Sequence, residues 1–323
     1  MSSLRLRLED LKGVFAIMPT PALADYSVDL EESRRGAEAL VQGGVDGIML
    51  TGTFGEASTL TEDEWRAFTE TVVKTVDGRI PVVAGPTTLN TRDTIARAKF
   101  AREVGAVGLL LGRPFWCELP SDAVLGFYRD VAEALPDMGI VVYNNPSAFK
   151  SKITPAMWAE LAEIPQVIGA KYGSYNEQYP SCFEAVNGKI RLMLMEKDWL
   201  KVYKLSPEHN IACWSGGASC HPEPVVALRE AIASGDLEQA GNLSNDIYKT
   251  YETFFPRGDR DLFRLYTIQV EKLRIQEAGY IKAGPSRPPY HEIPEEFAEG
   301  ARESGRRWQQ LAERLMEQHV RSQ

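Results

Sequence analysis

The stretch QVIGAKYG, residues 166–173, carries the clearest sign of the fold. The residues that lead to Lys171 are apolar or small, without the alternation of a half-exposed strand. Such a run is typical of a strand buried on both faces, as in a parallel sheet. Lysine is among the side chains least often fully buried, yet Lys171 stands where this strand should end. The position of this ammonium group therefore needs an explanation.

Seven other runs of the same kind occur along the chain, and amphipathic patterns separate them. Two of these patterns, residues 29–44 and 93–105, end on glycine, a usual stop signal for a helix. Eight strand-then-helix units in one chain predict a (β/α)₈ barrel. A doubly wound sheet is the alternative, but no GxGxxG motif follows the first run. The seven runs are GVFAIMPTP (13–21), DGIMLTG (46–52), IPVVAGP (80–86), AVGLLLGRP (106–114), GIVVYNNP (139–146), IRLMLME (190–196) and IACWSGG (211–217).

The rest of the chain is expected to be helical. Residues 228–255 contain the eighth barrel helix and its neighbour, and residues 264–281 form another helix. A proline-rich connection over residues 282–297 leads to a last charged helix. We predict one domain over residues 1–323, with the barrel at about 10–240 and a helical extension at about 241–323.

Composition limits the class of protein. The 323 residues are 44% hydrophobic and 25% charged, as in ordinary globular proteins, and the net charge of −9 disfavours a nucleic-acid partner. No run approaches the roughly 18 apolar residues of a membrane helix, and the N-terminus lacks the apolar core of a signal peptide. The four cysteines show no CxxC spacing, which indicates free thiols in a reducing compartment. We expect a soluble, cytoplasmic protein.

A metal centre is not expected. Metal-dependent carbon–carbon chemistry needs several histidine or carboxylate ligands at the strand ends. The four histidines are scattered, and none of the predicted strand ends bears an HxH pair.

The end of the second run, LTGTFGEAS (50–58), suits an anion. Its glycines, among them Gly52, allow a tight fold in which backbone N–H groups can hold a carboxylate. Thr53 adds a hydroxyl group, and Glu56 is placed to brace the turn. The alternative is a simple strand-to-helix turn, because a capping box begins at Thr61. The residues alone do not separate these two interpretations.

Two further strand ends carry reactive side chains. Desolvation should lower the pKa of Lys171, and a neutral amine condenses with a ketone to form a Schiff base. The alternative is a lysine that snorkels to the rim. Tyr143 ends the neighbouring run, either as a core residue or as an acid–base phenol. Because strand ends of a barrel meet at one face, these residues and the loop at Thr53 are expected to converge on one mouth.

The eighth run ends in CWSGGASC, residues 213–220. Its glycines, including Gly216, let a ligand approach the backbone. Trp214 either forms a wall for an aromatic substrate or packs in the core.

The motifs TGTFGE, YNNP, GAK and WSGGA, in this order, resemble the dihydrodipicolinate synthase / N-acetylneuraminate lyase superfamily over about residues 10–300. Its members are class I pyruvate aldolases on a TIM barrel, commonly homotetramers. The resemblance implies that Lys171 forms the Schiff base and that Tyr143 transfers protons. It further implies that the backbone at Thr53 and Phe54 holds the pyruvate carboxylate, and that the Thr53 hydroxyl contacts Tyr143.

Departures from the family pattern narrow the range of expected substrates. Dihydrodipicolinate synthases have a second threonine where this chain has Phe54, and two tyrosines where it has Phe115 and Trp116. They also have a carboxylate-binding arginine where this chain has Ala148. Synthesis of dihydrodipicolinate is therefore disfavoured.

A subgroup of the superfamily is more similar. The segments GTFGE, Pro-Phe-Trp at 114–116, AKY at 170–172 and KAGPSRPPY at 282–290 resemble the hydratase-aldolases that act on trans-o-hydroxybenzylidenepyruvate and trans-2′-carboxybenzalpyruvate. An aromatic mouth would suit an aryl aldehyde leaving group. Thr267 stands where the hydroxyaryl enzymes have asparagine, which favours the 2′-carboxy substrate. The aromatic residues expected at this mouth are Phe54, Phe115, Trp116, Phe149 and Trp214.

The resemblance implies hydration and cleavage of a benzylidenepyruvate to an aromatic aldehyde and pyruvate, in breakdown of polycyclic aromatics such as phenanthrene. It implies no cofactor beyond the covalent Schiff base, and a homotetramer. Other class I pyruvate aldolases, sugar-acid dehydratases and a non-catalytic keto-acid-binding barrel are the alternatives.

Overall fold

A computed structural model describes residues 4–322 and contains all eight predicted strands. They are parallel and close into a barrel in the order of the chain, which confirms the predicted (β/α)₈ fold. The strands are β1 (Gly13–Ile17), β2 (Gly47–Met49), β3 (Val82–Ala84), β4 (Gly108–Leu111), β5 (Gly139–Tyr143), β6 (Val167–Lys171), β7 (Arg191–Met195) and β8 (Ala212–Ser215).

Helices follow the strands as predicted. Those of the barrel are α1 (Leu30–Gln42), α2 (Glu62–Val76), α3 (Thr91–Val104), α4 (Ser121–Ala134), α5 (Pro146–Phe149), α6 (Pro155–Leu161), α7 (Tyr179–Val186), α8 (Glu196–Leu205) and α9 (Glu223–Ser234). The later helices are α10 (Leu237–Thr250), α11 (Arg260–Ala278) and α12 (Glu295–Ser322). Three short 3₁₀ turns are η1 (Leu8–Asp10), η2 (Gly217–Ser219) and η3 (Pro256–Gly258).

Local sequence explains where several of these helices begin and end. Asp29 caps α1 by accepting a hydrogen bond from the backbone N–H of Glu32. Thr61 and Glu64 form the predicted capping box of α2. Gly105 ends α3 in the left-handed conformation.

Backbone contacts divide the chain into two compact units, which are described separately below. The first unit contains residues 4–13 and 81–214, and the second contains residues 14–80 and 215–322. The predicted single domain, with the barrel at about 10–240 and a helical extension at about 241–323, stays a prediction.

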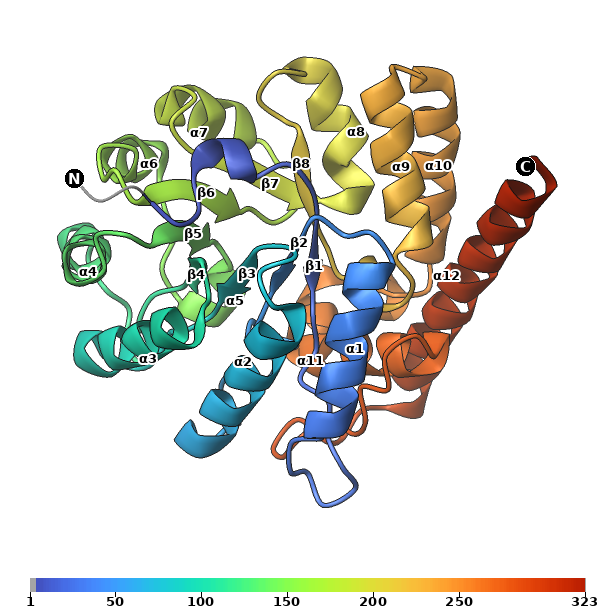
Figure 1. Cartoon of the computed structure of the whole chain (residues 1–323), viewed down its shortest axis with the longest axis horizontal. Helices are drawn as coiled ribbons and strands as arrows, with labels where there is room; N and C mark the ends of the chain where they lie inside the picture. Colours follow the sequence, from blue (N-terminus) through green and yellow to red (C-terminus); the bar gives the residue numbers. More distant parts are fainter. Residues whose placement is uncertain (1–3, 323) are drawn as a thin grey trace. The chain divides into compact units, whose positions relative to one another are not determined.

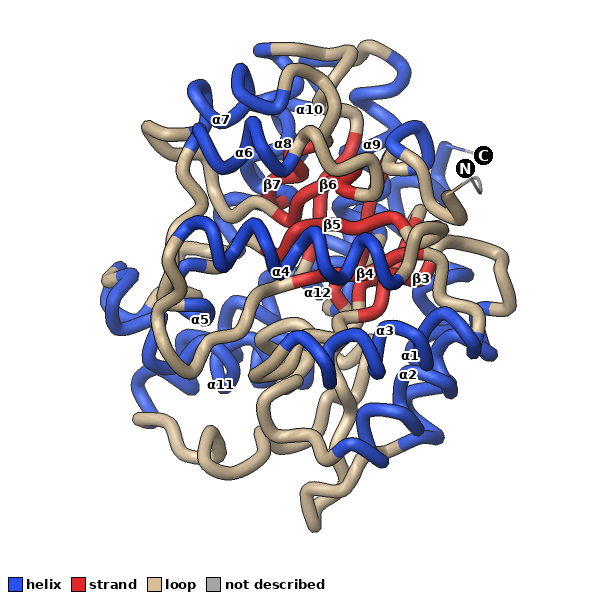
Figure 2. The backbone as a smooth tube through the Cα atoms, turned by 90° about the vertical axis from the view of Figure 1, so that its left-hand side faces the viewer, coloured by secondary structure: helices blue, strands red, loops and turns tan. Residues whose placement is uncertain are grey.

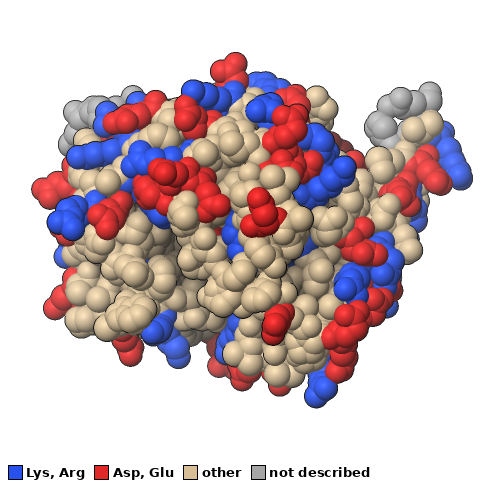
Figure 3. All heavy atoms as spheres, turned by 90° about the horizontal axis from the view of Figure 1, so that it is seen from below, with Lys and Arg blue, Asp and Glu red and all other residues tan. Residues whose placement is uncertain are grey.

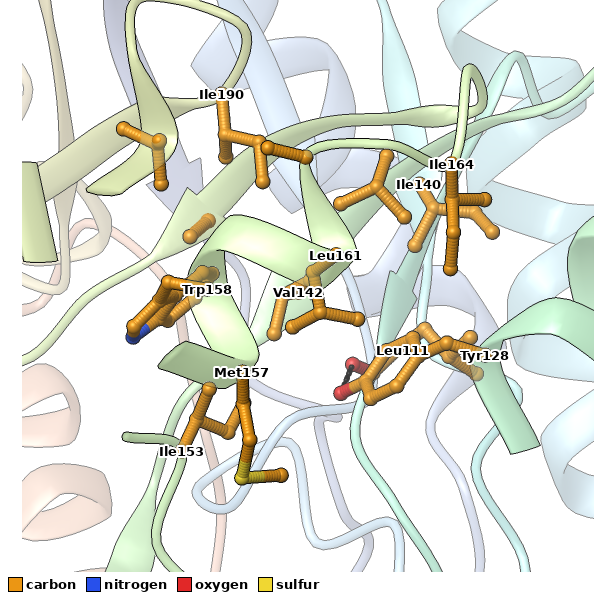
Figure 4. Packing of buried hydrophobic residues seen from close by; sticks show 14 of the residues in the cluster. Leu111, Tyr128, Ile140, Val142, Ile153, Met157, Trp158, Leu161, Ile164 and Ile190 are labelled. Carbon is orange, nitrogen blue, oxygen red and sulfur yellow. Dashed lines mark hydrogen bonds between the residues drawn. The ribbon is translucent and has the colours of Figure 1, made fainter. Parts of the chain in front are cut away.

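The core of the first unit lies between the strands and the helices outside them. The outward side chains of β4 to β7 pack against α4, α6 and α7, and Figure 2 shows α4 in front of the red strands β4 and β5. Alternation along the strands directs Val142 outward into this cluster. Tyr128 is buried there, and its hydroxyl donates to the carbonyl of Leu111 at 3.0 Å (Figure 4). The opposite faces of β5 and β6 are thereby left for the interior of the barrel.

The N-terminal segment covers the beginnings of three strands in the first unit. Glycine opens β4 and β5 and lies within β6, and a methyl group at any of these positions would overlap Leu6 or Leu11. Both leucines are buried. Figure 1 shows this dark blue segment, which includes η1, beside β6 and β7. Close approach therefore explains these glycines better than backbone flexibility does.

The second unit packs its late helices together. α12 contacts α9, α10 and α11. The fully buried guanidinium of Arg274 lies over the rings of Tyr251, Phe254 and Trp308, at 4.2, 5.0 and 4.9 Å from their centroids. Such cation–π contacts offset part of the cost of burying the charge.

Acidic and basic side chains are interleaved on the face that Figure 3 draws, with no large basic patch. Many of the basic side chains are paired, as in the ion pairs of Arg302, Arg306 and Arg307 on α12. Among residues 4–322, no helix is both long and apolar enough to span a membrane. The four cysteines are free thiols, as predicted, and only Cys117 is exposed.

Packing against Trp308 requires a glycine at position 217, because a methyl group there would overlap the indole ring. We expect Gly217→Ala to destabilise the fold by about 1–3 kcal/mol, the usual cost of overpacking a core. The measurement is the midpoint of thermal unfolding at a fixed scan rate. Gly241→Ala on α10 is the matched control, because nothing lies within 4 Å of a methyl group there. An unchanged midpoint for Gly217→Ala would contradict the packing argument.

Candidate active site

Lys171 lies at the carboxyl end of β6, as predicted. It pairs across the sheet with Tyr143, the last residue of β5. The backbone N–H of Asn144 donates to the Lys171 carbonyl at 3.1 Å and continues the pairing beyond the strand. Only 7% of Lys171 is exposed, so the side chain does not snorkel to solvent.

Two aromatic rings flank the Lys171 amine. Its Nζ is 3.5 Å from the centroid of Trp214 and 4.7 Å from that of Tyr143. The indole of Trp214 is fixed because its Nε1 donates to the Tyr172 carbonyl at 2.5 Å. Trp214 is buried and its ring lies against the amine, and the choice between a substrate wall and core packing stays a prediction.

This arrangement suits an amine that alternates between neutral and cationic forms. The neutral amine is the nucleophile that forms a Schiff base, and burial in general disfavours a charged form. A Schiff base formed from that amine is a cation when protonated. The faces of Trp214 and Tyr143 can stabilise a positive charge in a site from which water is excluded.

The phenol of Tyr143 has a polar neighbour that the sequence interpretation missed. Nδ2 of Asn145 donates to the Tyr143 hydroxyl oxygen at 3.3 Å. Oδ1 of Asn145 accepts from the backbone N–H groups of Ser147 and Ala148 and so caps α5. The cap fixes the amide with its donor toward the phenol. The sequence feature that could have indicated this cap is the asparagine directly before Pro146, because asparagine followed by proline is a typical start of a helix.

Phe149 is placed behind Tyr143 in the first unit. Its ring packs edge-on against Tyr143 with centroids 5.3 Å apart, and it lies against the backbone of Gly112. The Arg113 guanidinium lies 5.2 Å from the centroid of Phe149 and donates to the Ser151 hydroxyl at 2.7 Å. Burial lowers the pKa of Arg113. Phe149 therefore supports the phenol, and its predicted contact with substrate stays a prediction.

The other aromatic residues predicted for the mouth differ in exposure. Trp116 is 75% exposed and Phe115 is half-buried. The Phe115 ring is tilted against Phe149 with centroids 6.3 Å apart. Lys150 donates to the Trp116 carbonyl at 2.8 Å, which ties this loop to the end of α5.

In the second unit, the loop after β2 is compact and hydrogen-bonded. The N–H of Glu56 donates to the Thr53 carbonyl at 3.0 Å, and the Thr20 hydroxyl donates to the Gly55 carbonyl at 2.7 Å. Thr51 and Glu56 both have positive φ, which non-glycine residues seldom adopt. Backbone strain of this kind collects at functional sites.

Two predicted substrate-binding residues meet in the second unit. Phe54 is buried, and a methyl group at Gly216 would lie 3.6 Å from its Cζ and 3.6 Å from Oε2 of Glu271. Glu271 is a buried carboxyl that the sequence interpretation did not single out. A carboxyl group of α11 thus lies near the apolar side chain of Phe54 in the loop after β2.

Other predicted residues have local contacts. Thr267 is half-buried on α11, where its hydroxyl donates to the Phe263 carbonyl at 2.9 Å. Gly52 belongs to the buried part of the loop after β2, and its carbonyl accepts from Ala57 N–H at 3.4 Å. The roles of Thr267 and Gly52, and the contact of Thr53 with Tyr143, stay predictions.

Within the part of the chain that the structure describes, no three His, Cys, Asp or Glu side chains are gathered so as to hold a metal ion. The expectation that the protein needs no cofactor stays a prediction.

Comparisons with known proteins agree with these features. A family model described as the dihydrodipicolinate synthetase family matches residues 10–299. A trans-O-hydroxybenzylidenepyruvate hydratase-aldolase of Pseudomonas aeruginosa is 41% identical over 96% of each chain. A trans-2′-carboxybenzalpyruvate hydratase-aldolase of Nocardioides sp. strain KP7 is 42% identical over 95% of this chain and 96% of the relative.

Two solved structures are also similar to this chain. PhdJ bound to substrate intermediate is 44% identical, with a TM-score of 0.95, and the match covers 97% of this chain and 100% of PhdJ. A sialic acid aldolase of Ruminococcus gnavus is only 20% identical, with a TM-score of 0.81 over 96% of this chain and 100% of that one, and it shows a shared fold. The family model and the similarity to the two curated relatives extend over nearly the whole chain. The chain therefore belongs to the dihydrodipicolinate synthetase family.

Proposed function

We propose that this protein is a Schiff-base hydratase-aldolase that cleaves a substituted benzylidenepyruvate to an aromatic aldehyde and pyruvate. The observation that carries the proposal is the buried Lys171 amine between Tyr143 and Trp214. The names of two relatives, each more than 40% identical, support this reaction type. The position of Lys171 beside an acid–base phenol supports the chemistry.

The first step is formation of the Schiff base. The neutral amine of Lys171 attacks the ketone carbon, and water is lost to give an iminium ion. The substrate carboxylate is held by backbone N–H groups at Thr53 and Phe54. Phe54 itself is apolar and buried, in keeping with an aryl rather than a polyol substrate.

The iminium ion then activates the conjugated alkene. Water adds at the benzylic carbon, and the adjacent carbon is protonated by Tyr143 or by a water that it orients. Removal of the proton from the new hydroxyl group breaks the carbon–carbon bond and releases the aldehyde. The remaining enamine is protonated and hydrolysed to pyruvate, so one water is consumed in the overall reaction. Asn145 stabilises the Tyr143 oxygen when the phenol has lost its proton.

We further propose that the 2′-carboxy substrate is preferred over the 2′-hydroxy substrate, because Thr267 replaces the asparagine of the hydroxyaryl enzymes. This places the enzyme in the breakdown of polycyclic aromatics such as phenanthrene. Family membership also leads us to propose a cytoplasmic homotetramer that uses no metal or cofactor.

Borohydride reduction in the presence of pyruvate should label Lys171, because reduction converts the Schiff base into a stable secondary amine. Peptide mass analysis should locate the adduct on the peptide that contains Lys171. Lys171→Met should abolish labelling while its thermal unfolding midpoint stays close to that of the wild type. Lys189→Met is the matched control, since Lys189 is an exposed lysine paired with Glu163. A wild-type protein without an adduct would refute the Schiff-base mechanism.

A panel of 2′-carboxy-, 2′-hydroxy- and unsubstituted benzylidenepyruvates tests the substrate. Loss of enone absorbance should be fastest, as kcat/KM, for the 2′-carboxy compound, with aldehyde and pyruvate formed in equal amounts. Thr267→Asn should shift the preference toward the 2′-hydroxy compound. Cleavage of a keto-deoxy sugar acid without activity on any aryl enone would instead indicate a sugar-acid enzyme.

Tyr143→Phe should lower kcat by roughly 10²–10⁴-fold, the usual contribution of a general acid–base group. The substitution removes the hydroxyl group and keeps the ring that flanks Lys171, so Schiff-base trapping with pyruvate should persist. Asn145→Ser, which retains a helix-capping oxygen, should lower kcat by roughly 10- to 100-fold, because it removes one hydrogen bond to the charged phenolate oxygen, worth about 1.5–3 kcal/mol. A Tyr143→Phe enzyme with a near-normal rate would remove the phenol from the mechanism.

A further inference from the structure

A buried ion cluster lies in the second unit. It consists of Glu56, Lys272 and Arg287, whose side chains are 0%, 1% and 4% exposed. Oε2 of Glu56 accepts from Lys272 Nζ at 2.6 Å and from Arg287 Nη1 at 2.8 Å. Oε1 of Glu56 accepts from the backbone N–H of Arg287 at 2.6 Å. One carboxylate is thus held by two cations and one amide.

The three members come from distant parts of the chain. Glu56 belongs to the loop after β2 and has a φ of 53°. Lys272 lies on α11, and Arg287 lies in the proline-rich connection between α11 and α12. The cluster therefore fastens the loop after β2 to two segments that follow it by more than 200 residues, since the pairs are separated by 216 and 231 positions.

Lys272 and Arg287 also donate hydrogen bonds to backbone carbonyls of residues that precede the loop in the sequence. Lys272 donates to the carbonyls of Thr20 and Pro285, at 3.4 and 2.8 Å. The Thr20 hydroxyl in turn donates to the Gly55 carbonyl, next to Glu56. Arg287 donates to the carbonyl of Pro21 at 3.3 Å. The loop is consequently held at Gly55 and at Glu56.

Stability alone does not account for this cluster. Taking charges out of water is costly, and apolar residues of similar volume are often as stabilising as a buried ion pair. Burial lowers the pKa of Lys272 to about 8, which reflects that cost. Glu56 also occupies a backbone conformation that is unfavourable for a non-glycine residue. What the cluster provides is one defined conformation of the loop.

We propose that Glu56, Lys272 and Arg287 are positioning residues that hold the loop at residues 52–55 in the conformation that binds the carboxylate of the 2-keto acid. This inference rests on the proposed function, in which the backbone of this loop binds that carboxylate. The cluster does not touch the reacting carbon, so it acts on binding of the carboxylate and leaves the chemistry of Lys171 unchanged.

Loss of Lys272 should weaken pyruvate binding. Lys272→Met keeps a long side chain and leaves Glu56 paired with Arg287, so the fold should survive while the loop samples other conformations. If about a tenth of the molecules then have the binding conformation, the half-saturating pyruvate concentration for borohydride trapping rises roughly tenfold. Trapping of acetone, a ketone without a carboxylate, should keep the wild-type concentration dependence.

The matched control is Lys282→Met, because Lys282 is an exposed lysine that enters the same proline-rich connection. This control should match the wild type with both ketones. Arg287→Lys provides a second test that retains the positive charge, and it should raise the half-saturating pyruvate concentration with little change for acetone. It keeps the inference testable if Lys272→Met does not fold.

The possible results of these trapping experiments distinguish failure of the proposed function from failure of the positioning role. A wild-type protein that pyruvate does not label contradicts the proposed function itself. A labelled wild type with unchanged pyruvate dependence in both Lys272→Met and Arg287→Lys overturns the positioning role alone. Equal weakening of pyruvate and acetone trapping also overturns it, because a general structural defect would affect both ketones. Selective weakening for pyruvate supports it.

Discussion

The proposed chemistry depends on the burial of one amine. Lys171 ends a strand whose other residues are apolar or small, and its amine lies between the rings of Trp214 and Tyr143. Two physical effects oppose each other there. In general, exclusion of water disfavours a charged amine, whereas the electron-rich faces of aromatic rings stabilise a cation. A Schiff-base enzyme needs both, since a neutral nucleophile must become a cationic iminium in the same place.

The barrel provides this arrangement because parallel strands end side by side. Tyr143 and Lys171 are in register on β5 and β6, so the distance between phenol and amine is set by sheet geometry rather than by loop conformation. Neighbouring residues then restrict the orientation of the Trp214 and Tyr143 rings. Tyr172 accepts the Trp214 indole N–H, and Phe149 and Asn145 restrict Tyr143. Rigid elements hold reacting groups more accurately than loops do.

Sequence periodicity was sufficient to predict all eight strands, because strands buried on both faces produce continuous apolar runs. It was also sufficient to place Lys171 at a strand end. Contacts between distant segments could not be predicted in this way. Glu56 was expected to brace its turn, but its partners Lys272 and Arg287 follow it by more than 200 positions, as the separations of 216 and 231 show. The glycine at 217 is explained by a ring on α12, which local pattern does not reveal.

The fold alone does not select the substrate. A sialic acid aldolase that is 20% identical shares the barrel, with a TM-score of 0.81, although its name gives a substrate other than a benzylidenepyruvate. The choice of substrate must therefore depend on side chains other than the Lys171 amine and the Tyr143 phenol. By the resemblance described above, Phe54 and Ala148 are apolar residues at positions where the synthases are expected to have polar side chains. A polyol bound against such residues would lose hydrogen bonds to water without replacement, at a cost of about 1–3 kcal/mol for each unsatisfied group. An aryl ring has no such groups, so under the proposed function we expect apolar side chains at these two positions to disfavour a sugar and to accept the ring.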